Sequence, residues 1–236
     1  MPIRATLTAV AATAAACLLL APAALASPQS SHQPVQVTGK QLKSALLPTS
    51  DFAADYVAHS VADSGGSLEH LTVFKVPSMT CRNFWLLIGT VQGFGETAFA
   101  TDLVDAKSGA VALQEIFGQS VYQFASSHAA VSFYDAVMAK YGPCRSMTEP
   151  DTQGGTLRFT VHSQSKQRVD GHQALQLIEY MSDSKIAGPP VVTYVLWTVD
   201  GTDVYRIGTQ LLSTKSPRPT QSSLTLKLIA RVGALR

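Results

Sequence analysis

The stretch SSHAAVSFYDAVMAKYGPC (residues 126–144) carries the clearest structural pattern in the chain. Its apolar side chains recur at three- and four-residue steps, which places them on one helix face: Ala130, Phe133, Tyr134, Val137, Met138 and Tyr141. One of the two serines at its start supplies the side-chain oxygen that caps a first helical turn. Gly142 is expected to take the left-handed conformation that closes a helix, and Pro143 cannot continue it. The pattern predicts a helix that buries one face and ends just before Cys144.

Strand-like segments lie on both sides of this helix. A hairpin is predicted before it, from ETAFATDLVDA (96–106) and VALQEIFGQSVYQF (111–124), interrupted by KSG. After the polar loop MTEPDTQGG (147–155), four further strands are predicted: TLRFTVH (156–162), HQALQLIEYM (172–181), VVTYVLWTV (191–199) and DVYRIGTQLL (203–212). A terminal amphipathic helix follows in LTLKLIARV (224–232), with Leu224, Leu228, Ile229 and Val232 on its apolar face.

The N-terminal part of the mature chain gives weaker signals. Residues 42–46 favour a short helix that breaks at Pro48, and a second short helix is predicted to follow and to include Tyr56 and Val57. HLTVFKVP (70–77) alternates loosely like a strand. SMTCRNFWLLIG (78–89) is expected to form a helical turn.

These elements together predict an α+β fold. Strands joined by short turns pair antiparallel, so we expect a sheet of about six strands. The two amphipathic helices must bury their apolar faces, and packing both on one face of the sheet is the simplest arrangement. The other sheet face is then expected to remain open.

The first 26 residues resemble a cleaved secretory signal. One positive charge, Arg4, precedes an apolar run that ends in Ala-Leu-Ala before Ser27. The expected organisation is a signal peptide at 1–26, a flexible leader at 27–38 and one domain at 39–236. Cys17 lacks the context of a lipoprotein anchor, so export to the extracellular space or cell wall is favoured over lipid anchoring. No later segment reaches the ~18 apolar residues of a membrane span.

Charge and composition exclude several functions. Without Arg4, 17 of the 18 basic residues remain against 16 acidic ones, and no basic block stands out. Binding to nucleic acid through a strong positive field is therefore not expected. With 46% hydrophobic and 14% charged residues, the chain can bury a sizeable core.

Two cysteines remain after signal cleavage, Cys81 and Cys144. In an exported chain, an even pair without C-x-x-C spacing is interpreted first as a disulfide. Two buried free thiols are the alternative. A bridge would constrain the unfolded chain by ~4 kcal/mol in the loop-entropy model.

No catalytic or metal-binding motif is present. The six histidines are not paired with one another or with cysteine at ligand spacing: His32, His59, His70, His128, His162 and His172. GQSVY lacks the second glycine of a nucleophile elbow. Asp102, Asp105 and Glu115 are available as paired carboxylates but fit the solvated ends of a hairpin better. We therefore predict no catalytic residue, no metal and no cofactor.

One set of residues is a candidate for ligand binding. Asp200-Gly201 suits a two-residue type I′ turn, which places Trp197, Val195 and Arg206 on one sheet face. Tyr194, Leu196, Tyr205 and Ile207 then occupy the other face, toward the helices. The open face is predicted to carry Trp197 and Arg206, joined by Glu115, Gln119 and Gln123. An aromatic ring, a cation and amides make a ligand-binding wall, and a tryptophan merely covered by loop residues is the alternative.

The order of features is similar to that of the PknH-type extracytoplasmic sensor domain of actinobacteria. The resemblance rests on an LLP segment, TCRNFW, SSHAAVSFYDAVMAKYGPC, the strand meander and a terminal IARV helix, and it covers about residues 42–233. It implies an antiparallel sheet flanked by helices, a cleft for an unidentified ligand, and a family disulfide at Cys81 and Cys144. The second cysteine pair of the family is absent, since Ile178 and Ile207 lie near its expected positions.

Three functions follow as hypotheses. The first is a secreted, non-enzymatic sensor-like protein that binds a small molecule or a cell-wall ligand. The second is a secreted hydrolase with a site assembled from loops. The third is a structural or interaction protein of the cell envelope.

Overall fold

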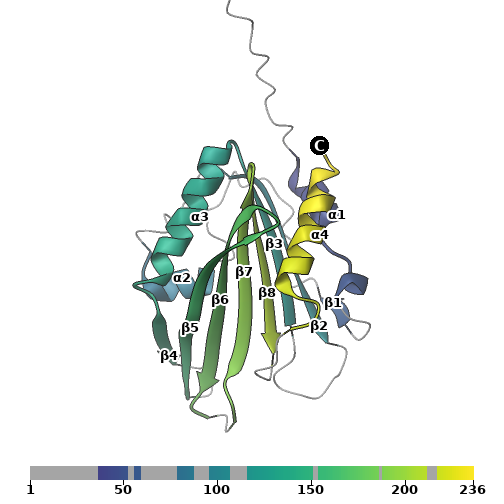
Figure 1. Cartoon of the computed structure of the whole chain (residues 1–236). Coiled ribbons are helices and arrows are strands. Elements are labelled where there is room, and N and C mark those ends of the chain that lie inside the picture. The colour runs from purple at the N-terminus through teal and green to yellow at the C-terminus, as the bar shows by residue number, and fades with distance from the viewer. Residues whose placement is uncertain are drawn as a thin grey trace, which may run out of the picture. The chain divides into compact units, whose positions relative to one another are not determined.

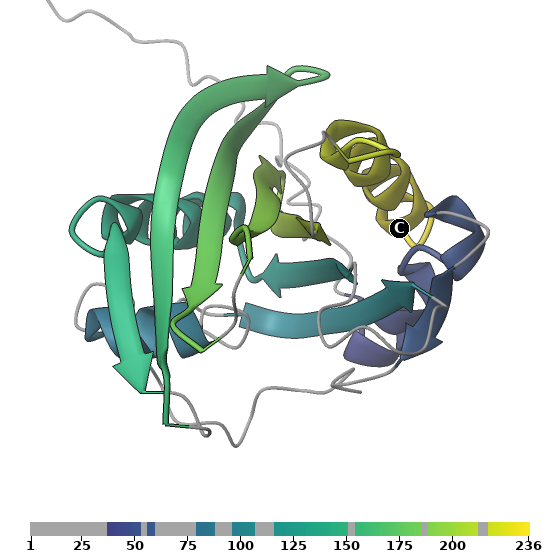
Figure 2. The ribbon, with the colours of Figure 1, turned by 90° about the horizontal axis from the view of Figure 1, so that it is seen from below.

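The computed structural model describes residues 37–52, 56–59, 79–87, 96–106, 116–150, 154–185, 188–211 and 217–236. Within these residues the chain forms one antiparallel sheet of eight strands, in the order β1-β2-β3-β8-β7-β6-β5-β4 (Figure 1). The strands are β1 (Tyr56–His59), β2 (Glu96–Ala106), β3 (Ile116–Phe124), β4 (Ser146–Pro150), β5 (Thr156–Val169), β6 (His172–Asp183), β7 (Val191–Asp200) and β8 (Asp203–Leu211). The sheet is curled, and the long strands β5 and β6 bend along their length (Figure 2). The predicted α+β class and antiparallel sheet are confirmed, but the predicted number of about six strands is too low, because β1 and β4 were not expected as strands.

Four α-helices and one short 3₁₀-helix belong to the described residues: α1 (Gly39–Ala45), η1 (Thr49–Asp51), α2 (Cys81–Leu87), α3 (Ser127–Tyr141) and α4 (Gln221–Gly233). The predicted long helix is confirmed as α3, and its six buried residues are those on the predicted apolar face. Ser126 caps it, accepting a hydrogen bond from Ala129 N at 3.2 Å. The terminal helix is confirmed as α4, with Leu224, Leu228 and Val232 buried.

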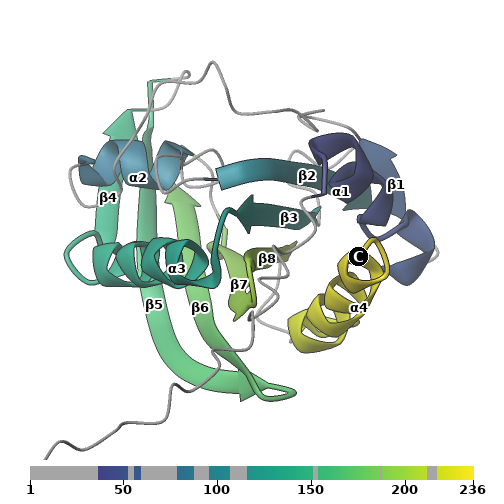
Figure 3. The ribbon, with the colours of Figure 1, turned by 90° about the horizontal axis from the view of Figure 1, so that it is seen from above.

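The helices cover both faces of the sheet. We call the side of Trp197 and Arg206 the α3 face, and the side of Tyr205 and Ile207 the α4 face. Figure 3 shows α2 and α3 together on one side of β3, β8 and β7, and α1 and α4 together on the other. The prediction that both amphipathic helices pack on one face is therefore wrong. The reason lies in β7, whose side chains are buried in both directions, so each sheet face needs its own cover.

Each face has its own core. On the α3 face, Phe133 and Tyr141 of α3 pack with Trp197, Tyr122 and Leu177. On the α4 face, buried residues of α1 and α4 pack against the strands: Leu42, Ala45, Leu224, Leu228 and Val232 against Ala98, Ala100, Phe117, Val121, Tyr205 and Ile207. Burial at these positions follows the two-residue alternation of the strands and the helical periodicity.

Some local predictions fail. Tyr56 and Val57 lie in strand β1 rather than in a second helix, and the predicted loop at 147–155 contains most of β4. Gly142 keeps a right-handed backbone, with φ −59° and ψ −63°, instead of the left-handed one. Val37, placed in the flexible leader from the sequence, is buried and donates its N–H to Gln123 Oε1 at 2.9 Å. The strand predicted at 70–77 and the KSG turn lie outside the described residues.

The hairpin between β7 and β8 turns one residue later than predicted. Asp200 pairs with Asp203, so the two loop residues are Gly201 and Thr202, and Gly201 alone takes a positive φ, of 56°. This pattern fits a type II′ turn, in which only the first loop residue requires a positive φ. The type I′ turn lies instead at the β5–β6 hairpin, where Asp170 and Gly171 have φ values of 49° and 85°.

The shift in this turn keeps the predicted faces. The pairing register moves by two residues, so each side chain stays on its predicted face. Trp197 now lies directly opposite Arg206 instead of opposite Val204. The two residues proposed to act together are thus cross-strand neighbours, which is the closest relation that an antiparallel pair allows.

Candidate functional site

A pocket of about 200 Å³ opens on the α3 face, beside α2. Its described lining residues are Trp85, Phe159, Glu179, Tyr180, Met181, Thr193, Arg206 and Gln210. The polar members come from three adjacent strands, because Glu179 pairs with Thr193 and Thr193 pairs with Gln210. They therefore form one row across β6, β7 and β8, which the sheet itself holds in place.

Arg206 reaches into this pocket along its own strand. Its Cζ lies 5.7 Å from the centroid of the Trp197 ring, in a cation–π contact. The guanidinium lies beside Gly208, where a Cβ would be in ordinary van der Waals contact with it, 3.8 Å from Arg206 Nη1. Arg206 Nε is shielded from solvent and has no hydrogen-bond partner among the described residues. A buried charged donor without a hydrogen-bond partner costs free energy, which an acceptor at this atom would recover.

Glu179 is the acidic group of the same pocket. Burial raises the pKa of its carboxyl to about 7, although the Arg206 charge and a hydrogen bond with Tyr141 both favour the ionised form. Desolvation is the largest of these effects. The Tyr141 hydroxyl in turn accepts a hydrogen bond from Trp197 Nε1 at 3.3 Å. A chain of contacts thus links the buried tryptophan to a carboxyl group that changes its charge near neutral pH.

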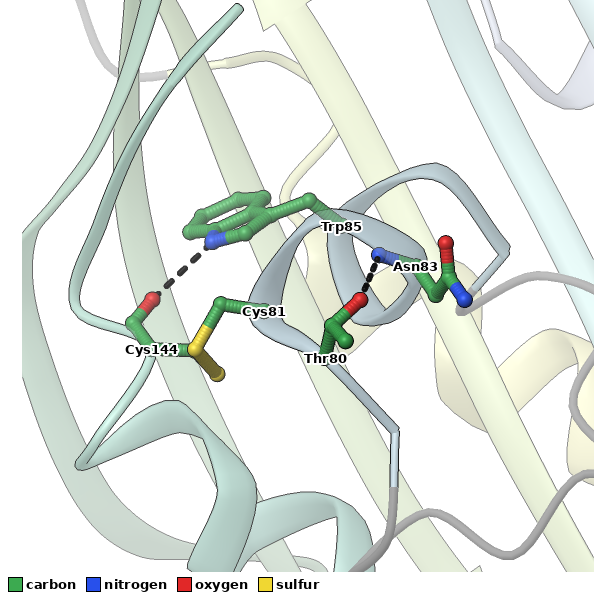
Figure 4. The surroundings of a disulfide bond; sticks show 5 residues. All are labelled: Thr80, Cys81, Asn83, Trp85 and Cys144. Carbon is green, nitrogen blue, oxygen red and sulfur yellow. Dashed lines mark hydrogen bonds between the residues drawn. A yellow bond between two sulfur atoms is a disulfide. The ribbon is translucent and has the colours of Figure 1, made fainter.

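The outer wall of the pocket is held by the disulfide. Thr80 caps α2, since its Oγ1 accepts a hydrogen bond from Asn83 N at 3.2 Å. Cys81 and Cys144 are bonded, with their Cα atoms 5.1 Å apart, which confirms the predicted bridge (Figure 4). Trp85, one turn further along α2, donates its Nε1–H to the Cys144 carbonyl oxygen at 2.9 Å. The end of α3 therefore fixes the helix that carries this indole.

Two further contacts orient this wall. The Trp85 ring stacks on Phe159 of β5, with 5.8 Å between centroids and an interplanar angle of 30°. Arg82 forms an ion pair with Glu149 of β4, with 2.6 Å between Nη2 and Oε1. The result is a flat aromatic surface facing a polar row, which suits a ligand with one apolar and one polar end.

The predicted site is only partly brought together. Trp197 is fully buried under α3, so it supports Arg206 from below and does not form an open wall. Arg206 does line the pocket. Gln119 and Gln123 lie on the α4 face, because Ser120 is the residue of β3 that pairs with Arg206. Glu115 lies outside the described residues.

Gln119 has a structural role instead. Its side chain is fully buried; Oε1 accepts from Leu47 N at 2.8 Å and Nε2 donates to Leu47 O at 2.9 Å. It thereby replaces a backbone partner for the segment that follows α1. Gln123 binds the Val37 backbone N–H in the same way.

We expect Gln119→Met to lower the free energy of unfolding by about 2 kcal/mol, because it leaves the N–H and C=O of buried Leu47 without partners. Urea unfolding followed by circular dichroism measures the change. Gln164→Met, at an exposed position of β5, is the matched control and should leave the midpoint unchanged. Equal midpoints for the two variants would contradict the structural role of Gln119.

The histidines do not build a catalytic site in the part of the chain that the structure describes. His172 Nδ1 lies 3.3 Å from Asp200 Oδ1, but this pair joins the ends of two hairpins and lines neither of the pockets described here. His162 stacks on Tyr180, with 4.6 Å between ring centroids. Within the described ranges, no three His, Cys, Asp or Glu side chains gather in a way that suits a metal ion.

Another pocket, of about 220 Å³, lies at the far end of β5, β6 and β7. Its described lining residues are Leu157, Met181, Ser182, Asp183, Gly188, Pro189 and Val191. Asp183 is the charged residue among them, and it accepts a hydrogen bond from Lys185 N at 2.8 Å. The pocket at Arg206 is the better candidate, because it combines an unpartnered charged donor with an aromatic surface.

Sequence reasoning missed Glu179, Tyr141 and Trp85 as members of the site. A signal for Glu179 exists: in HQALQLIEYM it shares the alternation of Leu175 and Leu177, which are fully buried. A carboxyl group at a position that the pattern assigns to the core is a common mark of a functional residue. The residues beside Glu179 in the row, Thr193 of β7 and Gln210 of β8, could not be found in this way, because they depend on the register of these two strands.

The pKa of Glu179 predicts a pH-dependent stability. The native carboxyl holds its proton up to about pH 7, whereas the unfolded one loses it near 4.5, so the native state binds more protons between these values. Stability is therefore lost as the pH rises from about 4.5 through 7. Glu179→Gln, which cannot ionise, is expected to be more stable than the original protein by about 3 kcal/mol at pH 8 and about equal to it near pH 4.5.

Urea unfolding at these two pH values tests this prediction. Gln164→Met, at an exposed position of β5, serves as the control, because neither side chain ionises. If Glu179→Gln shifts stability equally at both pH values, the carboxyl does not titrate as described.

The family model for the PknH-like extracellular domain matches residues 37–196. The crystal structure of the extracellular domain of PknH from Mycobacterium tuberculosis is similar, with a TM-score of 0.58 at 16% sequence identity, covering 84% of this chain and 97% of that one. This likeness shows the fold.

A protein of unknown function from Pseudomonas aeruginosa reaches a TM-score of 0.31 at 14% identity, covering 58% of this chain and 79% of that one. A comparison with curated proteins found no match. None of the helices within the described ranges is long and apolar enough to span a membrane.

Proposed function

Because the chain belongs to the family of PknH-like extracellular domains, we propose that it is an exported, sensor-like protein that binds a ligand in the pocket at Arg206. The proposal includes removal of residues 1–26 as a signal peptide and release outside the cell or at its wall. It assigns no catalytic role to any residue. The family is one of extracellular domains, which supports the location.

The observation that carries the proposal is the environment of Arg206. A guanidinium held over Trp197, with its Nε buried and unpartnered among the described residues, lines a pocket whose one described carboxyl group, Glu179, is largely protonated below neutral pH. The described ion pairs with carboxylates involve other cations: Arg82, His172, Lys227 and Arg236. An arginine kept in this way is more typical of recognition than of stability.

The aromatic wall adds to the support. Trp85 is fixed by a covalent bond one turn away and by a hydrogen bond to the end of α3, so it does not need to be ordered by a ligand. A preformed wall lowers the entropy cost of binding. The disulfide therefore supports function as well as stability.

Native mass spectrometry of the protein collected from the medium of its own producing cells tests the proposal. We expect a noncovalent adduct on the original protein and on Arg158→Met, a control at an exposed position of β5. Arg206→Met is expected to lose the adduct. An original protein without any adduct, or an Arg206→Met variant that retains it, would contradict binding at this pocket.

A further inference from the structure

We propose that the pocket takes a small organic acid, whose carboxylate is bound by Arg206 and whose flat apolar part lies against Trp85 and Phe159. This inference rests on the proposed function, since it names the chemical class of ligand for the same pocket. Size, charge and shape each point to this class.

The size of the pocket limits the ligand. A cavity of about 150 Å³ holds benzene, and pockets for drug-sized molecules begin near ~300 Å³. At about 200 Å³, the space between Trp85, Phe159 and the polar row holds a single ring with one substituent. Trp85 and Phe159 both line the pocket, and the planar rings that they present there favour a flat ligand.

The charge of the pocket favours an anion. Arg206 and Glu179 are the charged residues in its described lining, and only Arg206 keeps its charge at every relevant pH. Burial leaves Glu179 largely protonated below neutral pH, although Arg206 and Tyr141 both favour its ionised form, so the pocket then carries a net charge of +1. The planar fork of a guanidinium matches a carboxylate in a bidentate pair. A cationic ligand would instead meet the charge of Arg206 at close range.

A carboxylate fits better than a phosphate. A phosphate brings up to two negative charges and several acceptor oxygens, whereas the described lining offers one cation. The remaining polar side chains of the row, Thr193 and Gln210, are uncharged. One negative charge with two oxygens is what this set of groups can neutralise.

Glu179 makes the binding depend on pH. The titratable groups that face it are Arg206 from β8 and Tyr141 from α3, and Tyr122 of β3 also lies in the field of Arg206. An ionised Glu179 would repel a carboxylate, so the acid is bound to the protonated form. With a carboxyl pKa of about 7, the competent fraction falls roughly tenfold between pH 6 and pH 8. The ligand is expected to bind about tenfold more weakly at the higher pH.

Isothermal titration calorimetry with benzoate as the probe tests the inference. Benzamide is the neutral isostere, acetate carries the charge without the ring, and inorganic phosphate represents the other anion class. We expect benzoate to bind at least tenfold more tightly than each of these at pH 6, and about tenfold more weakly at pH 8. Titrations in two buffers of different ionisation enthalpy should show proton uptake at pH 8.

Four variants complete the design. Arg206→Met should weaken benzoate binding at least tenfold and leave benzamide unchanged, whereas Arg158→Met should bind both probes normally. Arg206→Lys keeps the charge without the planar fork, so it should bind benzoate with intermediate affinity. It replaces Arg206→Met in the test if that variant does not fold. Glu179→Gln should bind benzoate with equal affinity at pH 6 and pH 8.

The outcomes separate the two proposals. Benzamide binding as tightly as benzoate, phosphate binding more tightly, or an Arg206→Met variant with unchanged benzoate affinity would overturn the organic-acid class. Failure of all four probes would overturn it as well. In each case, an adduct that is lost in Arg206→Met during native mass spectrometry would leave the pocket as a ligand site. The absence of that adduct would remove the proposed function itself.

Discussion

Loss of the disulfide, through Cys81→Ala combined with Cys144→Ala, is expected to lower the free energy of unfolding by about 4 kcal/mol. The bond closes a loop with a sequence separation of 63, and removing it restores the conformational entropy of that loop to the unfolded chain. Cys144 is fully buried, so the double alanine variant avoids leaving two free thiols in the core. Guanidinium chloride unfolding of both proteins measures the difference.

The same change should also loosen the pocket. The position of Trp85 depends on α2, and this bond ties α2 covalently to the end of α3. Treatment of the original protein with a reducing agent is the matched control and should lower its melting temperature, whereas the double variant should not respond. An original protein whose melting curve is unmoved by reduction would contradict this account of the disulfide.

Trp197→Ala is expected to destabilise the protein by roughly 3–5 kcal/mol, the range for truncating a large core aromatic. Trp197 is fully buried and contacts the rings of Tyr122 and Phe133, with centroid distances of 6.2 and 6.3 Å. Its truncation also removes the hydrogen bond to Tyr141 and the support beneath the Arg206 guanidinium. Chemical unfolding and the melting temperature report this loss.

The chain offers a matched control, because it has two tryptophans. Trp85 is half-buried and lines the pocket, so Trp85→Ala should cost less stability, about 1–2 kcal/mol, while weakening ligand binding more directly. The reverse order of stabilities would show that Trp85 is the core residue and Trp197 the exposed one.

The parts of the fold with strong local signals could be predicted from the sequence. The six buried residues of helix α3 follow from helical periodicity, and the cap at Ser126 follows from the side-chain chemistry of a first turn. The Cys81–Cys144 pair follows from the number of cysteines that remain if residues 1–26 are a cleaved signal peptide. Each of these predictions depends only on residues that are close in sequence or on the number of cysteines.

Features that depend on tertiary contacts could not be predicted. Val-Asp-Gly occurs before both His172 and Thr202, yet the first hairpin turns at Asp170-Gly171 and the second at Gly201-Thr202. The second turn is fixed from outside the hairpin, since Thr202 Oγ1 accepts a hydrogen bond from Arg236 at 3.1 Å. Nothing within the hairpin sequence encodes that contact with the end of the chain.

The candidate site shows the same division. Arg206 and Trp197 were placed on one face by strand alternation alone, and they are neighbours. Gln119 was assigned to the wrong face because its strand pairs with β8 through a register that no local signal gives. Glu179 and Trp85 reach Arg206 through β6 and α2, whose positions depend on the sheet order and on the disulfide.

The account depends on the statement that Arg206 is held for a ligand. A crystal structure of the protein purified directly from its native secretion medium tests this most directly. We expect electron density for a bound molecule within about 3 Å of the Arg206 guanidinium, between Glu179 and the stacked rings of Trp85 and Phe159. A guanidinium paired directly with the Glu179 carboxylate, in a pocket closed by the protein's own side chains, would contradict the account.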